Sequence, residues 1–214
     1  MSSAGLRASE VTRRFRRGPH PVVLAYPEVV LEPGELVAVT GPSLTGKTIL
    51  VDLLAGWDRP DGGRIVWDGG SPEPLPWPRL TVIPQGFAVL DELTVRENIV
   101  LADRVAGRRP PDADRLHRLL DVLGLDRLQG RGIGQVSVGE RQRTMVARAL
   151  ADRPEVVLAD EPVAHQDRRH ADAVLQLLRE AVAVDGAACL VATRDPAVAD
   201  IADRTIRLAA PGQP

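Results

Sequence analysis

Runs of consecutive apolar residues recur along this chain, and each run is bounded by glycine, proline or polar residues. The clearest runs cover residues 36–40, 80–83, 156–159 and 189–193. An unbroken apolar stretch of this length is typical of a strand that is buried on both faces. Residues 64–67 predict a further short strand, placed between expected turns at residues 60–63 and 68–70.

Other segments carry apolar residues at the spacing of an amphipathic helix. Residues 49–55 show this spacing and end at Gly56, and residues 171–184 repeat it over a longer stretch. The helical pattern prevails from residue 91 to residue 150, with one clear apolar face over residues 115–123. Prolines at the end of Arg108–Pro111 are expected to interrupt the helices there.

The N-terminal part has a different character. The first 35 residues predict two short strands, with turns at Gly18–Pro19 and Pro33–Gly34. Residues 71–78 are rich in proline and predict an irregular surface loop. Strand runs that alternate with helical segments favour an α/β fold with a mainly parallel sheet.

These elements predict a single domain over residues 1–214. Its core is expected to combine residues 1–84 and 154–214, with an N-terminal antiparallel β subdomain beside the parallel sheet. Residues 85–153 are expected to form an inserted α-helical subdomain. A chain of 214 residues is long enough to bury one substantial core.

The composition of the chain argues against several classes of function. The net charge of −2 and the isoelectric point of about 6.1 argue against a nucleic-acid partner that is held by bulk charge. The single cysteine, Cys189, lies in an apolar run and is expected to be a buried small side chain. No run of 18 apolar residues is present, so the sequence predicts no direct insertion into a membrane.

A phosphate-binding loop is the most specific motif. Gly41–Thr48 fits the pattern G-x-x-x-x-G-K-[ST], and Lys47 is the only lysine among the 27 basic residues. The motif lies between an expected strand and an expected helix, which disfavours a chance glycine turn. The expected nucleotide-binding residues of this loop are Gly41, Pro42, Ser43, Leu44, Thr45, Gly46, Lys47 and Thr48. The sequence therefore predicts a P-loop NTPase core that binds a nucleotide with Mg²⁺, to which Thr48 would offer its hydroxyl.

Two further elements could complete the phosphate site. Asp160 ends an apolar strand and is expected to hold the metal, directly or through water. Glu161 is expected on the other side of the strand, free to polarise an attacking water. Gln85 follows the strand at 80–83 and could ligate Mg²⁺ or orient water, although a lone glutamine is more often polar surface.

A capped helix is predicted from Val136 onward. Ser137 suits the N-cap position, and Glu140 lies three residues later at capping-box spacing. The same residues have a second interpretation, since an exposed helix N-terminus with a hydroxyl and a glycine, here Gly139, favours anions.

The chain resembles the ATP-binding subunits of ABC transporters. The resemblance rests on four elements that occur in this order: the phosphate loop, Gln85, Ser137–Glu140 and Asp160–Pro162. The resemblance covers nearly the whole chain. It implies a homodimer or heterodimer that binds ATP between two copies arranged head to tail, so that Ser137, Gly139 and Glu140 face the nucleotide of the other copy. Asp167 matches the family's loop after the catalytic acid, and the resemblance places it among the nucleotide-binding residues.

The resemblance also implies a membrane partner. An integral-membrane permease subunit would place a coupling helix on residues 86–100, and the ATPase would lie in the cytoplasm, peripheral on the inner face of the plasma membrane. Residues 90–99 and 158–162 are similar to the branch that serves lipoprotein release, macrolide export and cell division. Phe15 would stack on adenine, while a core phenylalanine remains the alternative.

Departures from the family pattern raise a second hypothesis. Val138 replaces the first of two signature glycines, Leu44 replaces a glycine of the phosphate loop, and Arg194 replaces the switch histidine. Arg194 can donate hydrogen bonds to a γ-phosphate but cannot act as a neutral imidazole. The first hypothesis is still an active ATPase, with Glu161, Gln85 and Arg194 as catalytic residues.

The alternative is a degenerate, slowly hydrolysing regulatory subunit that pairs with a standard ABC ATPase. A soluble ABC protein that acts on ribosomes or in DNA repair fits less well, because the chain has one cassette and no coiled coil. A generic kinase or GTPase leaves the Ser137–Glu140 element without a role. The sequence leaves the cargo and the direction of transport open.

Overall fold

The computed structural model describes residues 5–17, 20–67, 71, 73–107 and 111–209. The turns expected at Gly18–Pro19 and at residues 68–70 lie outside the described residues, as does most of the helix break expected at residues 108–111.

A parallel sheet forms the centre of the molecule. Its strands are β4 (Leu36–Thr40), β6 (Leu80–Ile83), β7 (Val156–Asp160), β8 (Ala188–Thr193) and β9 (Arg204–Arg207). They form a 5-stranded sheet in the order β6-β7-β8-β4-β9, and every neighbouring pair is parallel. The apolar runs predict β4, β6, β7 and β8 to within one residue. The apolar pattern does not predict β9, because this edge strand carries arginines at both ends.

The central strands are buried on both faces. Leu36 and Ala38 of β4 belong to a hydrophobic core that includes residues of the helices α5 (Val138–Ala151) and α6 (Arg168–Ala183). Val37 and Val39 belong to a second core on the opposite face. Successive side chains of a strand point to opposite faces, so an uninterrupted apolar sequence supplies both cores at once.

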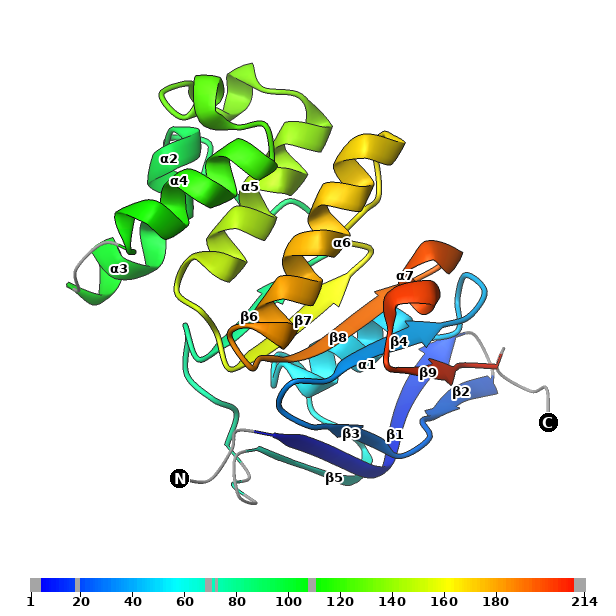
Figure 1. The fold of residues 1–214 in the computed structure, drawn as a ribbon. Helices are drawn as coiled ribbons and strands as arrows, with labels where there is room; N and C mark the ends of the chain where they lie inside the picture. The colour runs from blue at the N-terminus through cyan, green and yellow to red at the C-terminus, as the bar shows by residue number, and fades with distance from the viewer. Residues whose placement is uncertain (1–4, 18–19, 68–70, 72, 108–110, 210–214) are drawn as a thin grey trace.

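A second sheet is antiparallel and covers the face of the parallel sheet that carries α1 (Figure 1). It consists of β1 (Leu6–Arg17), β2 (His20–Ala25), β3 (Val29–Leu31) and β5 (Gly62–Trp67). The expectation of two short strands in the first 35 residues is therefore wrong, since this segment contains three, and β1 alone spans 12 residues. Pairing with β2, β3 and the distant β5 holds β1 extended over this length, and a local pattern does not report such partners.

The helices are distributed unevenly along the chain. They are α1 (Lys47–Leu54), α2 (Val95–Ile99), α3 (Leu101–Ala106), α4 (Ala113–Val122), α5, α6 and α7 (Pro196–Ile201), with short 3-10 turns at Asp126–Leu128 and Ile133–Gln135. Figure 1 shows α2, α3, α4 and α5 gathered at one end of the molecule, while α6 lies across the parallel sheet. Among the described residues, no helix is long and apolar enough to cross a membrane.

Cys189 lies in β8 and is fully buried, with 0% of its surface exposed. Burial raises the pKa of its thiol to about 12, so the side chain is a packing residue, as its apolar surroundings in the sequence indicate.

Asp203 ties the sheet to α6. Its carboxylate accepts a hydrogen bond of 2.8 Å from the backbone amide of Leu36 and pairs with Arg179, with an Nη1–Oδ2 distance of 2.6 Å. The Arg179 guanidinium, assisted by the Leu36 amide, lowers the pKa of Asp203 from 3.8 to about 2. The charged carboxylate therefore stabilises the start of β4.

We predict that Asp203→Asn lowers the free energy of unfolding at pH 7 by about 1 kcal/mol, because the pair is partly exposed and screened by solvent. A depressed pKa contributes stability above the ordinary value and loses it as the pH falls, so the difference should disappear between pH 3.8 and about 2. Chemical denaturation across this pH range measures it. Asp172→Asn, which breaks an exposed pair within α6, is the control; a difference that does not depend on pH would contradict the assignment.

Candidate functional site

The site lies where three neighbouring strands end. β7, β8 and β4 are adjacent and parallel, with Asp160 opposite Ala192 and Thr193 opposite Thr40 in the register. Their carboxyl ends therefore meet at one edge of the sheet, where open α/β sheets bind ligands. The phosphate loop follows β4, Glu161 follows β7 and Arg194 follows β8.

The phosphate loop needs glycine at position 46. Gly46 has a φ of 89°, in the left-handed region, and precedes the first residue of α1. A Cβ atom at this position would come within 2.7 Å of both Leu24 Cδ1 and the Tyr26 hydroxyl oxygen. The Tyr26 hydroxyl also donates a hydrogen bond of 3.1 Å to the Gly46 carbonyl, which fixes the loop against β2.

Lys47 lies inside the loop. Its ammonium group donates hydrogen bonds of 2.8 and 2.9 Å to the carbonyl oxygens of Gly41 and Pro42. Burial lowers the pKa of Lys47, and the nearby Glu161 carboxylate opposes this shift. Within the described part of the chain, no side chain caps the N-terminus of α1, so its first amides can receive an anion.

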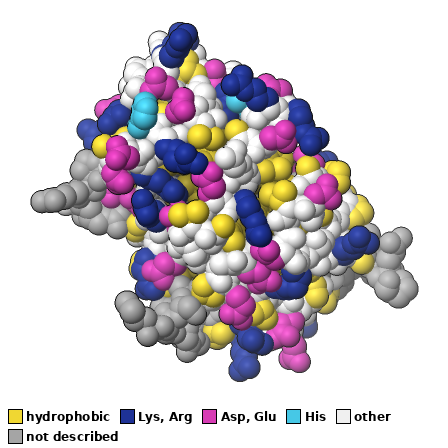
Figure 2. All heavy atoms as spheres, viewed as in Figure 1, with side chains coloured by type: hydrophobic (Ala, Val, Ile, Leu, Met, Phe, Trp, Pro, Cys, Tyr) yellow, Lys and Arg dark blue, Asp and Glu magenta, His cyan; other side chains and the backbone are white. Residues whose placement is uncertain are grey.

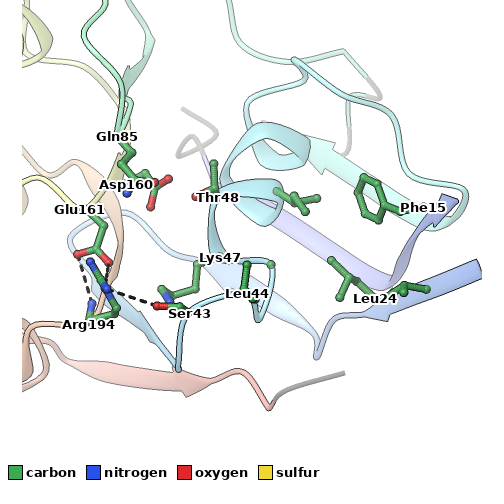
Figure 3. A pocket seen from close by; sticks show the side chains of 13 residues that line it. Phe15, Leu24, Ser43, Leu44, Lys47, Thr48, Gln85, Asp160, Glu161 and Arg194 are labelled. Atoms are coloured by element: carbon green, nitrogen blue, oxygen red, sulfur yellow. Dashed lines mark hydrogen bonds and ion pairs between the residues drawn. The ribbon is translucent and has the colours of Figure 1, made fainter. Parts of the chain in front are cut away.

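A cavity of about 980 Å³ adjoins the loop. Figure 3 shows it extending from Phe15 and Leu24 at one end, past Lys47, to Glu161 and Arg194 at the other. Its lining consists of Phe15, Val22, Leu24, Ser43, Leu44, Gly46, Lys47, Thr48, Ile49, Gln85, Asp160, Glu161 and Arg194. One end is thus apolar and the other is charged, which suits a ligand with an aromatic part and an anionic part.

Most of the predicted residues come together here, including Phe15, Gln85 and Arg194. Phe15 is half-buried: it packs against the core and also lines the cavity. Sequence reasoning missed Val22 and Leu24 of β2. The signal was present in the apolar run of that strand, in which the register places Val22 opposite Phe15 and Leu24 two residues further on.

Asp160 is a buried carboxylate, with 2% of its surface exposed. Burial raises its pKa, and the Thr48 hydroxyl opposes the rise. Among the described residues, neither of its oxygens has a well-formed hydrogen bond. A buried acid in this state is destabilising by itself, and a bound cation would compensate for its charge.

The surroundings of Asp160 fit Mg²⁺. Thr48 and Gln85 line the same cavity, and their side-chain oxygens are of the kind that Mg²⁺ prefers as ligands. No cluster of three or more histidine, cysteine or acidic side chains that could hold a metal occurs in the described part of the chain. Mg²⁺ does not require one, because it usually keeps water ligands and substrate phosphates.

Glu161 lies beside Asp160 in the same cavity, so the expectation that it points to the other side of the strand is wrong. The reason is its backbone: Glu161 has a φ of 48°, which breaks the alternation of the strand. Its Oε2 atom accepts hydrogen bonds of 2.9 Å from the Thr193 hydroxyl and 3.3 Å from the Arg194 amide.

The carboxylate is also not free, contrary to expectation. The Arg194 Nε atom lies 3.1 Å from Glu161 Oε1 in an ion pair.

The capped helix is confirmed as α5, with Ser137 at its N-cap and a complete capping box with Glu140. Its N-terminus, with Gly139, lies outside the cavity described above. The loop after β7 is tied to it, because the Gln166 side chain donates a hydrogen bond of 3.0 Å to the Gly139 carbonyl. Sequence reasoning missed Gln166. Asp167, the next residue, caps α6 by accepting a hydrogen bond of 3.0 Å from the His170 amide.

Comparison with known proteins identifies the family. A profile described as ABC transporter matches residues 26–164. The lipoprotein-releasing system ATP-binding protein LolD 1 of Rhodospirillum rubrum is 37% identical over 97% of this chain and 96% of its own length. The ABC transporter ATP-binding protein YxdL of Bacillus subtilis is 35% identical over 82% of this chain and 72% of its own length.

A solved structure gives the same result. The ATP-binding cassette MJ0796, as a dimer in a post-hydrolysis state bound to ADP and Pi, superposes with a TM-score of 0.84 at 27% identity. The superposition covers 96% of this chain and 94% of the other. The resemblance and the fold class inferred from the sequence are therefore confirmed: this chain belongs to the ABC transporter family.

Proposed function

We propose that this chain is an ATP-binding and ATP-hydrolysing subunit that dimerises around ATP and drives a separate membrane permease. The observation that carries the proposal is the cavity that joins an aromatic end at Phe15, the phosphate loop and the Asp160–Glu161 pair. The nucleotide-binding core consists of residues 1–84 and 154–214. The helical lobe consists of residues 85–153 and carries α5.

ATP enters with its adenine against the Phe15 ring, while Val22 and Leu24 provide apolar surface at this end. The amides of Gly41–Thr48 and the Lys47 ammonium hold the phosphates. Lys47 then exchanges the carbonyl oxygens of Gly41 and Pro42, at 2.8 and 2.9 Å, for phosphate oxygens. A nucleotide can contact both the apolar end of the cavity and the phosphate loop, whereas a free phosphate can contact only the loop, so the site favours a nucleotide.

Hydrolysis depends on positioning and charge. Glu161 accepts the proton of the attacking water, and Gln85 orients that water. Lys47 and Arg194 stabilise the negative charge that develops on the phosphate oxygens. Asp160, Thr48 and Gln85 would hold Mg²⁺, which would supply positive charge against the outer phosphates.

The second copy completes the site. Ser137, Gly139 and Glu140 at the start of α5 face the γ-phosphate that is bound by the partner subunit, and Asp167 lies at the same interface. The hydrogen bond of 3.0 Å from Gln166 to Gly139 fixes the loop after β7 to the start of α5. Val138 is 47% exposed beside them, so its side chain is free to contact the second copy.

The permease binds at residues 86–100. Phe87 and Leu90 present apolar surface there, with 45% and 46% of their surfaces exposed. Asn98 supports the segment from beneath, since its buried side chain accepts a hydrogen bond of 2.8 Å from the Leu90 amide and donates one of 3.0 Å to the Leu90 carbonyl. The subunit lies in the cytoplasm, peripheral on the inner face of the plasma membrane.

The charge distribution does not favour a nucleic-acid partner. Acidic and basic side chains are interspersed on the face shown in Figure 2, and the net charge is −2. Because several relatives are ATP-binding proteins of lipoprotein-releasing systems, we place this chain with lipoprotein release or a related task of that branch. Co-purification in detergent should recover a membrane permease and show whether the second cassette is an identical copy.

We predict that Glu161→Gln lowers the rate of ATP hydrolysis by the purified chain about 100-fold or more, because the amide cannot accept the proton. A phosphate-release assay measures the rate, and Glu180→Gln, which alters an exposed pair with Arg118, is the control. Equal rates for the native chain and Glu161→Gln would contradict an active homodimer. That result would favour the slowly hydrolysing regulatory subunit.

We predict that Asp160→Asn raises the free energy of unfolding of the nucleotide-free chain by about 1–2 kcal/mol at pH 7, because it removes a buried unpaired charge. A raised pKa costs stability only above the ordinary value of 3.8, so the gain should shrink in acid. Mg²⁺ added together with ATP should stabilise the native protein more than ATP alone, and the variant should lose this additional stabilisation. Thermal unfolding with and without ligands measures both effects; a less stable nucleotide-free variant would contradict the assignment.

A further inference from the structure

Arg194 joins two parts of the site across the cavity. Its Nε atom lies 3.1 Å from Glu161 Oε1, and its Nη1 atom donates a hydrogen bond of 3.3 Å to the Ser43 hydroxyl. One guanidinium group therefore holds both the predicted catalytic carboxylate and the phosphate loop, as the dashed lines in Figure 3 show. A carboxylate in such a pair is a poor proton acceptor for water.

The two partners differ in their freedom to move. The Arg194 side chain is 60% exposed, whereas the Glu161 side chain is 9% exposed. Glu161 has anchors that do not involve the guanidinium, namely the Thr193 hydroxyl at 2.9 Å and the Arg194 backbone amide at 3.3 Å. If the guanidinium leaves, the carboxylate keeps its position, so the arginine is the mobile partner.

The charge balance of the cavity supplies a reason for it to leave. The charged lining residues are Lys47 and Arg194 against Asp160 and Glu161, which balance each other. A triphosphate brings several further negative charges to the loop that Arg194 already touches at Ser43. The γ-phosphate of ATP competes strongly for an exposed guanidinium, whereas a diphosphate ends at the β-phosphate and places no group at that position.

We propose that Arg194, besides contacting the phosphate of ATP, acts as a latch on Glu161 that the γ-phosphate releases. Without nucleotide, the latch neutralises the carboxylate. When ATP is bound, Arg194 turns to the terminal phosphate and leaves Glu161 free to accept a proton. This inference rests on the proposed function and adds to it a means by which the chain distinguishes ATP from ADP before hydrolysis.

A double-mutant cycle tests the latch at the level of binding. The proteins are the native chain, Glu161→Gln, Arg194→Ala and the double variant, titrated by calorimetry with Mg²⁺ and either a non-hydrolysable imido analogue of ATP or ADP. Because the latch competes with the terminal phosphate, Glu161→Gln should tighten binding of the analogue about 3- to 10-fold when Arg194 is present. In the Arg194→Ala background the gain should fall below about twofold, and ADP affinity should change less than about twofold throughout.

The controls separate the latch from other effects. Arg194→Lys keeps a cation and should retain part of the gain, and it replaces Arg194→Ala if that variant folds poorly. Arg118→Ala, which breaks an ion pair outside the cavity, should change neither affinity. A gain from Glu161→Gln that is equal or larger without Arg194 would overturn the latch, since it would reflect only repulsion between Glu161 and phosphate. Failure of the native chain to bind either nucleotide would overturn the proposed function as well.

Discussion

The parallel pairing of β7, β8 and β4 is the constraint on which the rest of the molecule depends. It brings three loops that are distant in the sequence to one edge of the sheet, with Asp160 opposite Ala192 and Thr193 opposite Thr40. The pairing is possible because each strand is apolar along its length and is buried between two cores. Hydrophobic burial of the strands therefore fixes the positions of the site residues. The polar residues of the site lie where the strands end and the chain leaves the buried core.

Much of this arrangement can be predicted from the sequence, for identifiable reasons. The central strands are encoded as local apolar runs, and the phosphate loop is encoded as glycines and a lysine at fixed spacing. The start of α5 is equally local, since Ser137 and Glu140 lie within one helical turn of each other. The family resemblance adds the expected role of Arg194, which no local pattern supplies.

Other features depend on distant partners or on backbone conformation, and the sequence does not show them. The length of β1 depends on pairing with β2, β3 and β5, which come later in the chain. The alternation of a strand predicts opposite directions for Asp160 and Glu161, but a φ of 48° at Glu161 turns both into the cavity. The ion pair between Glu161 and Arg194 joins residues whose side chains meet only after β7 and β8 have paired.

The burial of Cys189 has a practical consequence. It is the single cysteine of the chain, its exposure is 0%, and a pKa of about 12 keeps the thiol protonated at neutral pH. Maleimide reagents need an accessible thiolate, so the native fold offers them no target of its own. One cysteine introduced at an exposed position would carry a fluorophore or spin label without background, and the approach of the two cassettes could be followed with the natural sequence otherwise intact.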